Sequence, residues 1–215
     1  MANYVVADPA GKSKYEPLIK DMWNWMYTRN CDQNPKQGDI TFLRDESLGN
    51  NRIVHAGFTM QRPSNAYRQT FRIDVGEGCF AAVYHVNIVK SDPFHLGGGP
   101  CKTISNCFKT AQNDMGNLYD KWANITEPGN SASHAIVDNL DDYYFEVGPF
   151  TVKVPDNNNA LQTEQGLALK KGDHEGVVVG YFLLIEDFKP GKYEIDMGGN
   201  ATNWYTHSIY RLNVR

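Results

Sequence analysis

The residues of this chain best suited to chemistry include six histidines, and two of them have apolar neighbours. His85 and Asn87 stand two residues apart in the apolar stretch 80–89, so on a strand both side chains lie on one face. A buried polar group needs a hydrogen-bond partner. We therefore expect these two side chains either to bond within the core or to line a pocket between a sheet and a helix. His55 follows the same pattern and has the same two interpretations.

A metal site is considered at Asp92 and His95, where a carboxylate and an imidazole share a glycine-rich segment that could fold over an ion. The chain contains no His-Glu-x-x-His motif and no cysteine–histidine cluster. The alternative is a polar loop in which Asp92 begins a turn before Pro93. We keep the two residues as metal candidates and expect no cofactor.

Sequence motifs of nucleophilic and nucleotide-dependent enzymes are missing: there is no Gly-x-Ser-x-Gly elbow, phosphate loop or dinucleotide fingerprint. A catalytic pair of carboxylates of the glycosidase type has no such sequence motif, because its separation of about 5–10 Å depends on the tertiary fold. Glu146, Glu186 and Asp187 are the acids closest to apolar strands. If the chain is an enzyme, we expect a hydrolase with an acid- or metal-based site near His85 and Asn87.

Other ionisable residues are expected in solvent. His207 alternates with Arg211 on the polar face of the last strand, and the segment 172–176 crowds three ionisable groups into a solvated loop. His134 and the acidic pair at 141–142 are expected at exposed strand ends. None of these residues is a candidate for the site.

Aromatic residues make up 12% of the chain, and several lie beside loops or on polar faces. Tyr143, Trp204 and Tyr205 are examples, and exposed tyrosine and tryptophan favour interfaces or stacking on sugars. The alternative is that these rings fill the core of a β-sandwich. Under the first interpretation they are the candidate residues for binding a glycan.

Composition and charge exclude several classes of protein. The formal charge of the 215 residues is −4, with acids and bases interspersed, so the basic surface that nucleic acids require is missing. The longest mostly apolar run, 176–185, is about half of the ~20 residues that a membrane helix needs. The first ten residues lack the charged and apolar segments of a signal peptide. We expect a soluble protein and leave its compartment open.

Two kinds of periodicity predict the elements that position these residues. Ser13 can cap a helix with Pro17 in its first turn, and apolar residues recur at helical spacing as far as Met26. From Asp39 onward apolar and polar residues alternate, which is typical of half-buried antiparallel strands. The clearest alternations are 67–75, 150–154, 192–197 and 210–214.

Two further segments, 80–89 and 177–185, are apolar on both faces and are predicted to be central strands. Met115 and Trp122 share a face of a second predicted helix over 110–123. Pro190 and Gly191 suit a type II turn that would pair 181–186 with 192–197 as a hairpin, with the last strand beside it.

These elements predict one mainly β domain: an antiparallel β-sandwich, jelly-roll-like, with an N-terminal helix and one short additional helix. Residues 1–30 form the N-terminal segment and docking helix, and residues 31–215 form the sandwich, within the same domain.

The C-terminal third resembles the ending of a widespread, functionally uncharacterised family of microbial β-rich proteins. The family has an Asp-Gly-Tyr strand, then Pro-Gly-Lys/His-x-x-Ile and a closing Tyr-x-Leu-x-Val, and here 177–185, 190–195 and 210–214 match them in order. The chain departs from the family at Val179, where Asp is usual, and near His85, where proline is expected. The resemblance implies a compact β-rich domain and no established reaction.

The four cysteines, Cys31, Cys79, Cys101 and Cys107, allow three pairings, and no Cys-x-x-Cys spacing indicates a zinc or redox site. Cys101 and Cys107 could close a small loop. The alternative is four partly buried thiols.

The sequence favours a non-enzymatic structural or interaction module that self-associates as a homo-oligomer or binds a protein partner through edge strands and exposed aromatic residues. One alternative is a carbohydrate-binding protein, in which Trp204, Tyr205 and Tyr143 stack on sugars. The other is the hydrolase with its site near His85 and Asn87.

Overall fold

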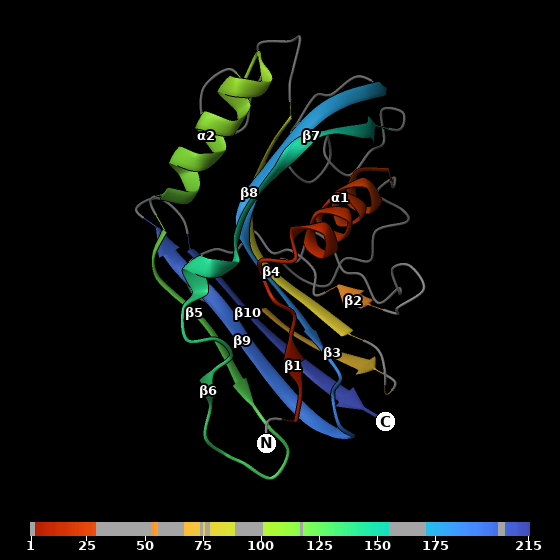
Figure 1. Cartoon of the computed structure of the whole chain (residues 1–215), viewed down its shortest axis with the longest axis vertical. Helices are drawn as coiled ribbons and strands as arrows, with labels where there is room; N and C mark the ends of the chain where they lie inside the picture. Colours follow the sequence, from red (N-terminus) through yellow and green to blue (C-terminus); the bar gives the residue numbers. More distant parts are fainter. Residues whose placement is uncertain are drawn as a thin grey trace.

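The structure is a computed structural model that describes residues 3–28, 53–55, 67–73, 75, 78–88, 101–116, 118–154, 171–201 and 205–215. It confirms the predicted mainly β chain, with two five-stranded sheets in a sandwich-like arrangement (Figure 1). The jelly-roll connection order stays a prediction. Among the described residues, neither α-helix is long and apolar enough to cross a membrane.

Strand order defines the two sheets. The first sheet contains β1 (Val5–Val6), β8 (Gly172–Glu186), β4 (Gly78–Ile88) and β2 (Ile53–His55) in that order, and β7 (Tyr144–Val154) also pairs with β8. The second contains β3 (Tyr67–Ile73), β10 (Tyr205–Val214), β9 (Gly191–Ala201), β5 (Leu118–Thr126) and β6 (His134–Ala135) in that order. The helices are α1 (Lys12–Thr28), α2 (Ile104–Gly116) and the short 3₁₀ helix η2 (Leu140–Tyr143).

Strand β8 is buried on both faces from Gly176 to Ile185, as the run of apolar residues predicted. Its odd-numbered residues, Val179 and Leu183 among them, pack in one hydrophobic core with the second sheet and α2. Its even-numbered residues, Phe182 and Leu184 among them, pack in another core with α1 and β7. Figure 1 shows α1 and α2 on opposite sides of β8. One strand therefore joins two cores.

Helix α1 is the predicted docking helix. It begins at Lys12, so Ser13 lies within its first turn instead of capping it, and Pro17 lies beyond that turn. Tyr15 and Ile19 are fully buried in the core shared with β7. The Tyr15 ring stacks on Phe145 with centroids 4.6 Å apart, and its hydroxyl donates to the carbonyl oxygen of Ala7 at 2.8 Å.

The alternations at 150–154, 192–197 and 210–214 are confirmed, because their apolar residues are buried and their polar residues point outward. The segment 67–73 is a strand, but it pairs in parallel with β10 and not in the antiparallel sense expected. A register shift between Val147 and Phe150 changes which residues face inward, so both halves of β7 bury their apolar side chains against α1.

The predicted helix over 110–123 is wrong in its bounds. Helix α2 ends at Gly116, and Leu118 begins strand β5, which pairs with β9. A spacing of four residues places side chains on one face of a helix and also on one face of a strand, so the pattern did not separate the two. Glycine is a frequent helix terminator, which favours the observed boundary.

The predicted hairpin of 181–186 with 192–197 is also wrong, because β8 and β9 belong to different sheets. β8 pairs with β4 on one side and with β7 and β1 on the other, so no edge of it is left for β9. β9 pairs instead with β5 and β10, and the predicted contact with the last strand is confirmed. The segment 172–176 is not a loop but the start of β8, paired with β7.

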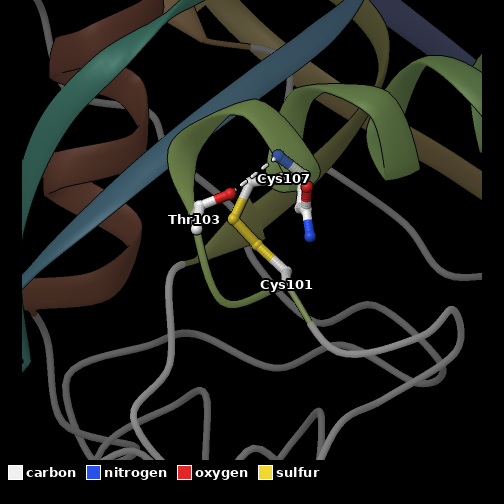
Figure 2. The surroundings of a disulfide bond; sticks show 4 residues. Cys101, Thr103 and Cys107 are labelled. Carbon is white, nitrogen blue, oxygen red and sulfur yellow. Dashed lines mark hydrogen bonds between the residues drawn. A yellow bond between two sulfur atoms is a disulfide. The ribbon is translucent and has the colours of Figure 1, made fainter.

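A disulfide joins Cys101 to Cys107 at the start of α2 (Figure 2). Both cysteines are buried, and they pack with Val177 of β8. The Thr103 hydroxyl accepts a hydrogen bond from the Asn106 backbone N–H at 3.2 Å, which caps the helix. A closed loop of this size contributes on the order of 2 kcal/mol.

Cys79 is a free thiol with no exposed surface, and burial raises its pKa to about 12. In a Cys31→Ser variant, we expect a thiol reagent at about pH 8 to react with none of the native protein and with one thiol after unfolding. Reaction of the native protein would contradict the burial of Cys79. Three reactive thiols after unfolding would contradict the disulfide.

Burial also raises the pKa of Tyr15 and Tyr210 above the ordinary value of about 10. The unfolded chain ionises these groups near pH 10 while the folded chain keeps them protonated. Their contribution to stability is therefore fully present below about pH 10 and is lost as the pH rises further. In urea titrations above about pH 10, Tyr15→Phe should flatten the fall of the unfolding free energy by up to about 1.4 kcal/mol per pH unit.

Equal slopes for the Tyr15→Phe variant and the parent protein would contradict the assignment.

Candidate functional site

The predicted site residues of the first sheet lie at separate places. His85 and Asn87 lie in β4, in register with Val179 and Val177 of β8, and both of these valines are fully buried. His55 is the last residue of β2 and pairs with Phe80 of β4. Phe80 lies five residues before His85 in the same strand. At about 3.3 Å per residue this separation is roughly 16 Å, so the backbone does not bring His55 and His85 together.

Tyr143 lies in η2 and is partly buried. Its ring packs edge-on to Tyr15, with centroids 6.5 Å apart, and contacts both hydrophobic cores. Burial is the main cause of its raised pKa. The contacts of Tyr143 are therefore those of a packing residue.

Tyr205 begins β10 in the second sheet, opposite Asn200. Trp204, Asp92, His95 and Cys31 lie outside the described residues. Within the part of the chain that the structure does describe, no three His, Cys, Asp or Glu side chains are grouped to hold a metal ion.

Glu146 and Glu186, two of the acids near apolar strands, do not form a carboxylate pair. Glu146 accepts a hydrogen bond from Gln112 Nε2 at 2.9 Å, and Glu186 pairs with Lys14 at 2.5 Å. Glu146 lies in register with Val179, seven residues from Glu186 along β8. This corresponds to about 23 Å, well beyond the roughly 5–10 Å of a glycosidase pair.

The outward surface of the second sheet carries polar side chains on three neighbouring strands. We call it the outer face. Cross-strand register aligns its positions in β5, β9 and β10, and the inward positions between them are buried in the core. The outer face contains Trp122, Asn124, Thr126, Lys192, Glu194, Asp196, His207, Arg211 and Asn213.

Three of these side chains form a cluster at one end of the outer face. The Trp122 indole N–H donates to the Asp196 carboxylate, and His207 Nε2 lies 3.0 Å from the same oxygen. The indole and imidazole rings meet edge to face at 5.3 Å across Gly198, which has no side chain to separate them. Contrary to expectation, His207 is only 20% exposed, because this cluster covers it.

A groove of about 690 Å³ opens at the other end of the outer face. One wall is the loop 126–130 that follows β5. The floor and the second wall come from β9 and β10, which contribute Lys192, Glu194, Arg211 and Asn213. We call this site the polar groove.

Polar contacts orient three of the charged side chains of the polar groove. Arg211 Nε donates to Glu194 at 2.9 Å across neighbouring strands. Glu127 accepts from Asn3 Nδ2 at 2.5 Å and lies 3.4 Å from His134 Nε2. Each of the two carboxylates that line the groove therefore has a partner of its own.

The N-terminal segment holds the loop wall in place. Besides its bond to Glu127, Asn3 accepts through its carbonyl oxygen from the Tyr193 hydroxyl at 3.2 Å and from the Lys189 backbone N–H at 2.9 Å. Gly191 packs directly against Pro128 of the loop. The groove is thus built from segments that are distant in sequence, which is why sequence patterns did not reveal it.

Comparisons with known proteins identify no family for this chain. No protein-family model matches it, and no curated protein matches it. Among solved structures, a chain in the structure of PbICP-C in complex with falcipain-2 is similar at a TM-score of 0.28 and 12% identity, over 76% of this chain and 98% of that one. A similarity of this size supports no inference about fold or function.

A substitution at Gly191 tests how the loop wall of the groove packs on β9. Its φ is +154°, and a Cβ there would overlap the Pro128 ring. We expect Gly191→Ala to destabilise the fold by about 1–3 kcal/mol in urea denaturation, because both the backbone and the loop must move. Gly116→Ala is the control, since its Cβ would meet nothing within 4 Å. Equal stabilities for the two variants would contradict this packing.

Proposed function

We propose that this protein is a non-enzymatic binding module and that the polar groove holds its partner. The observation that supports the proposal is the set of polar side chains that β9, β10 and the loop 126–130 direct into one groove. Most of these side chains stand on strands with a core behind them, so little backbone freedom is lost when a partner binds. Since the groove carboxylates are engaged with neighbouring groups, the groove is better suited to recognition than to proton transfer.

The structure gives less support to pairing through an edge strand. β7 is the longest strand that has a single strand neighbour among the described residues. Its ladder is interrupted at Gly148 and Pro149, and proline has no N–H to donate. Interruptions of this kind are a common protection of sheet edges. A partner molecule or a second copy of the chain is therefore expected at the groove and not along β7.

A photo-crosslinking amino acid at position 213, in the groove, tests this proposal. The control carries the same amino acid at Lys153, an exposed position in β7. In an extract of the source cells, we expect an adduct at position 213 that intact mass measurement detects, and none at position 153. A double variant with Arg211→Ala should lose that adduct. Equal labelling at both positions, or no adduct together with a strictly monomeric chain in sedimentation, would contradict the proposal.

A further inference from the structure

Three properties of the polar groove point to the chemical class of its ligand. We infer that the ligand is a neutral oligosaccharide, which rests on the proposed function of the groove. These properties of the groove are its balance of charge, the pairing of its backbone groups within the sheet, and the kinds of side chain that are left to contact a ligand.

The groove has little net charge. The positive charge of Arg211 is balanced by Glu194 at 2.9 Å, and Lys192 and Glu127 have opposite charges. A phosphate-rich or polyanionic ligand is recognised by several unbalanced lysines or arginines. A strongly basic ligand would in turn require unbalanced carboxylates. The groove therefore fits an uncharged ligand better than a polyanionic or a strongly basic one.

Most backbone groups beneath the groove are already paired in the sheet. β10 lies between β9 and β3 and is paired on both sides, whereas β9 is paired with β10 from Gly191 to Asn200 and with β5 from Glu194 onward. An extended peptide that adds to a sheet obtains much of its affinity from main-chain hydrogen bonds at a free edge. Only the short stretch 191–193 of β9 lacks a second strand here, which is too little for an added strand, so recognition depends mainly on side chains.

The side chains at the groove suit hydroxyl groups. Thr126, Asn130 and Asn213 each supply both a donor and an acceptor. The Asn130 side-chain oxygen accepts from the Ala132 backbone N–H at 2.9 Å, which leaves its NH₂ group for the ligand. Arg211 is 54% exposed, and only its Nε is committed to Glu194. A sugar hydroxyl, which is donor and acceptor at once, matches this set.

Apolar surface is available beside these groups. Pro128 lines the groove two residues before Asn130, so a ligand meets a C–H surface and a hydrogen-bonding group on the same wall. A sugar ring presents the same combination, with C–H groups on its face and hydroxyls around its rim. The groove thus matches the amphipathic character of a saccharide.

Titration of the ¹⁵N-labelled protein with neutral hexasaccharides tests the inference. The probes are the hexasaccharides of β-1,4-glucose, α-1,4-glucose, xylose, mannose and N-acetylglucosamine, with a polygalacturonate hexasaccharide as the anionic comparison. We expect at least one neutral probe to shift the amide signals of Asn130, Lys192, Arg211 and Asn213 saturably. Arg211→Ala and Asn213→Ala should each weaken that binding about tenfold, and Lys153→Ala should not. The spectra of the free variants show whether each is folded.

The outcomes separate the ligand class from the proposed function. If the anionic probe binds at these signals and no neutral probe does, the inference is wrong and the groove is still a binding site. If no saccharide shifts them while the crosslinker at position 213 captures a protein, the inference is wrong and the binding module stands. If both experiments are negative, the inference and the proposed function fail together.

Discussion

The burial of β8 on both faces is the constraint on which the rest of the structure depends. Its odd-numbered side chains belong to the core that the second sheet closes, and its even-numbered side chains belong to the core that α1 closes. Neither layer can shift without exposing apolar surface, at a cost of about 25 cal/mol for each Å². With the inner surface of the second sheet fixed in this way, its outer face is free to carry polar side chains.

The polar groove illustrates how a site arises from sheet register. Glu194 and Arg211 are 17 residues apart in the chain, yet antiparallel pairing of β9 with β10 places them in contact on the outer face. Asn3 reaches Glu127 across 124 residues of sequence, and brings the N-terminal segment to the same wall. An exposed ion pair of this kind adds about 0–1 kcal/mol to stability, so its main effect is to orient the groups around it.

Local patterns predicted the strands well and their neighbours poorly. The alternation in 192–197 and 210–214 identified which side chains are buried, because burial of one face is encoded residue by residue. Pro190 and Gly191 predicted a turn, but a turn does not specify which sheet receives the strand that follows. The pairing of Trp122 with Asp196 and His207 depended on that missing register, although each residue is at an outward position of its own strand. The alternation correctly predicted that His55, His85 and Asn87 lie on strands. His55 lies in β2, however, and is therefore separated from His85 and Asn87, which lie in β4.

The disulfide is a local bond, since its cysteines are only six positions apart in the sequence. It does not connect the two sheets, and both of its sulfur atoms lie at one end of α2. Reduction would therefore remove a constraint worth on the order of 2 kcal/mol at the start of this helix, while β8 continues to hold the two sheets together.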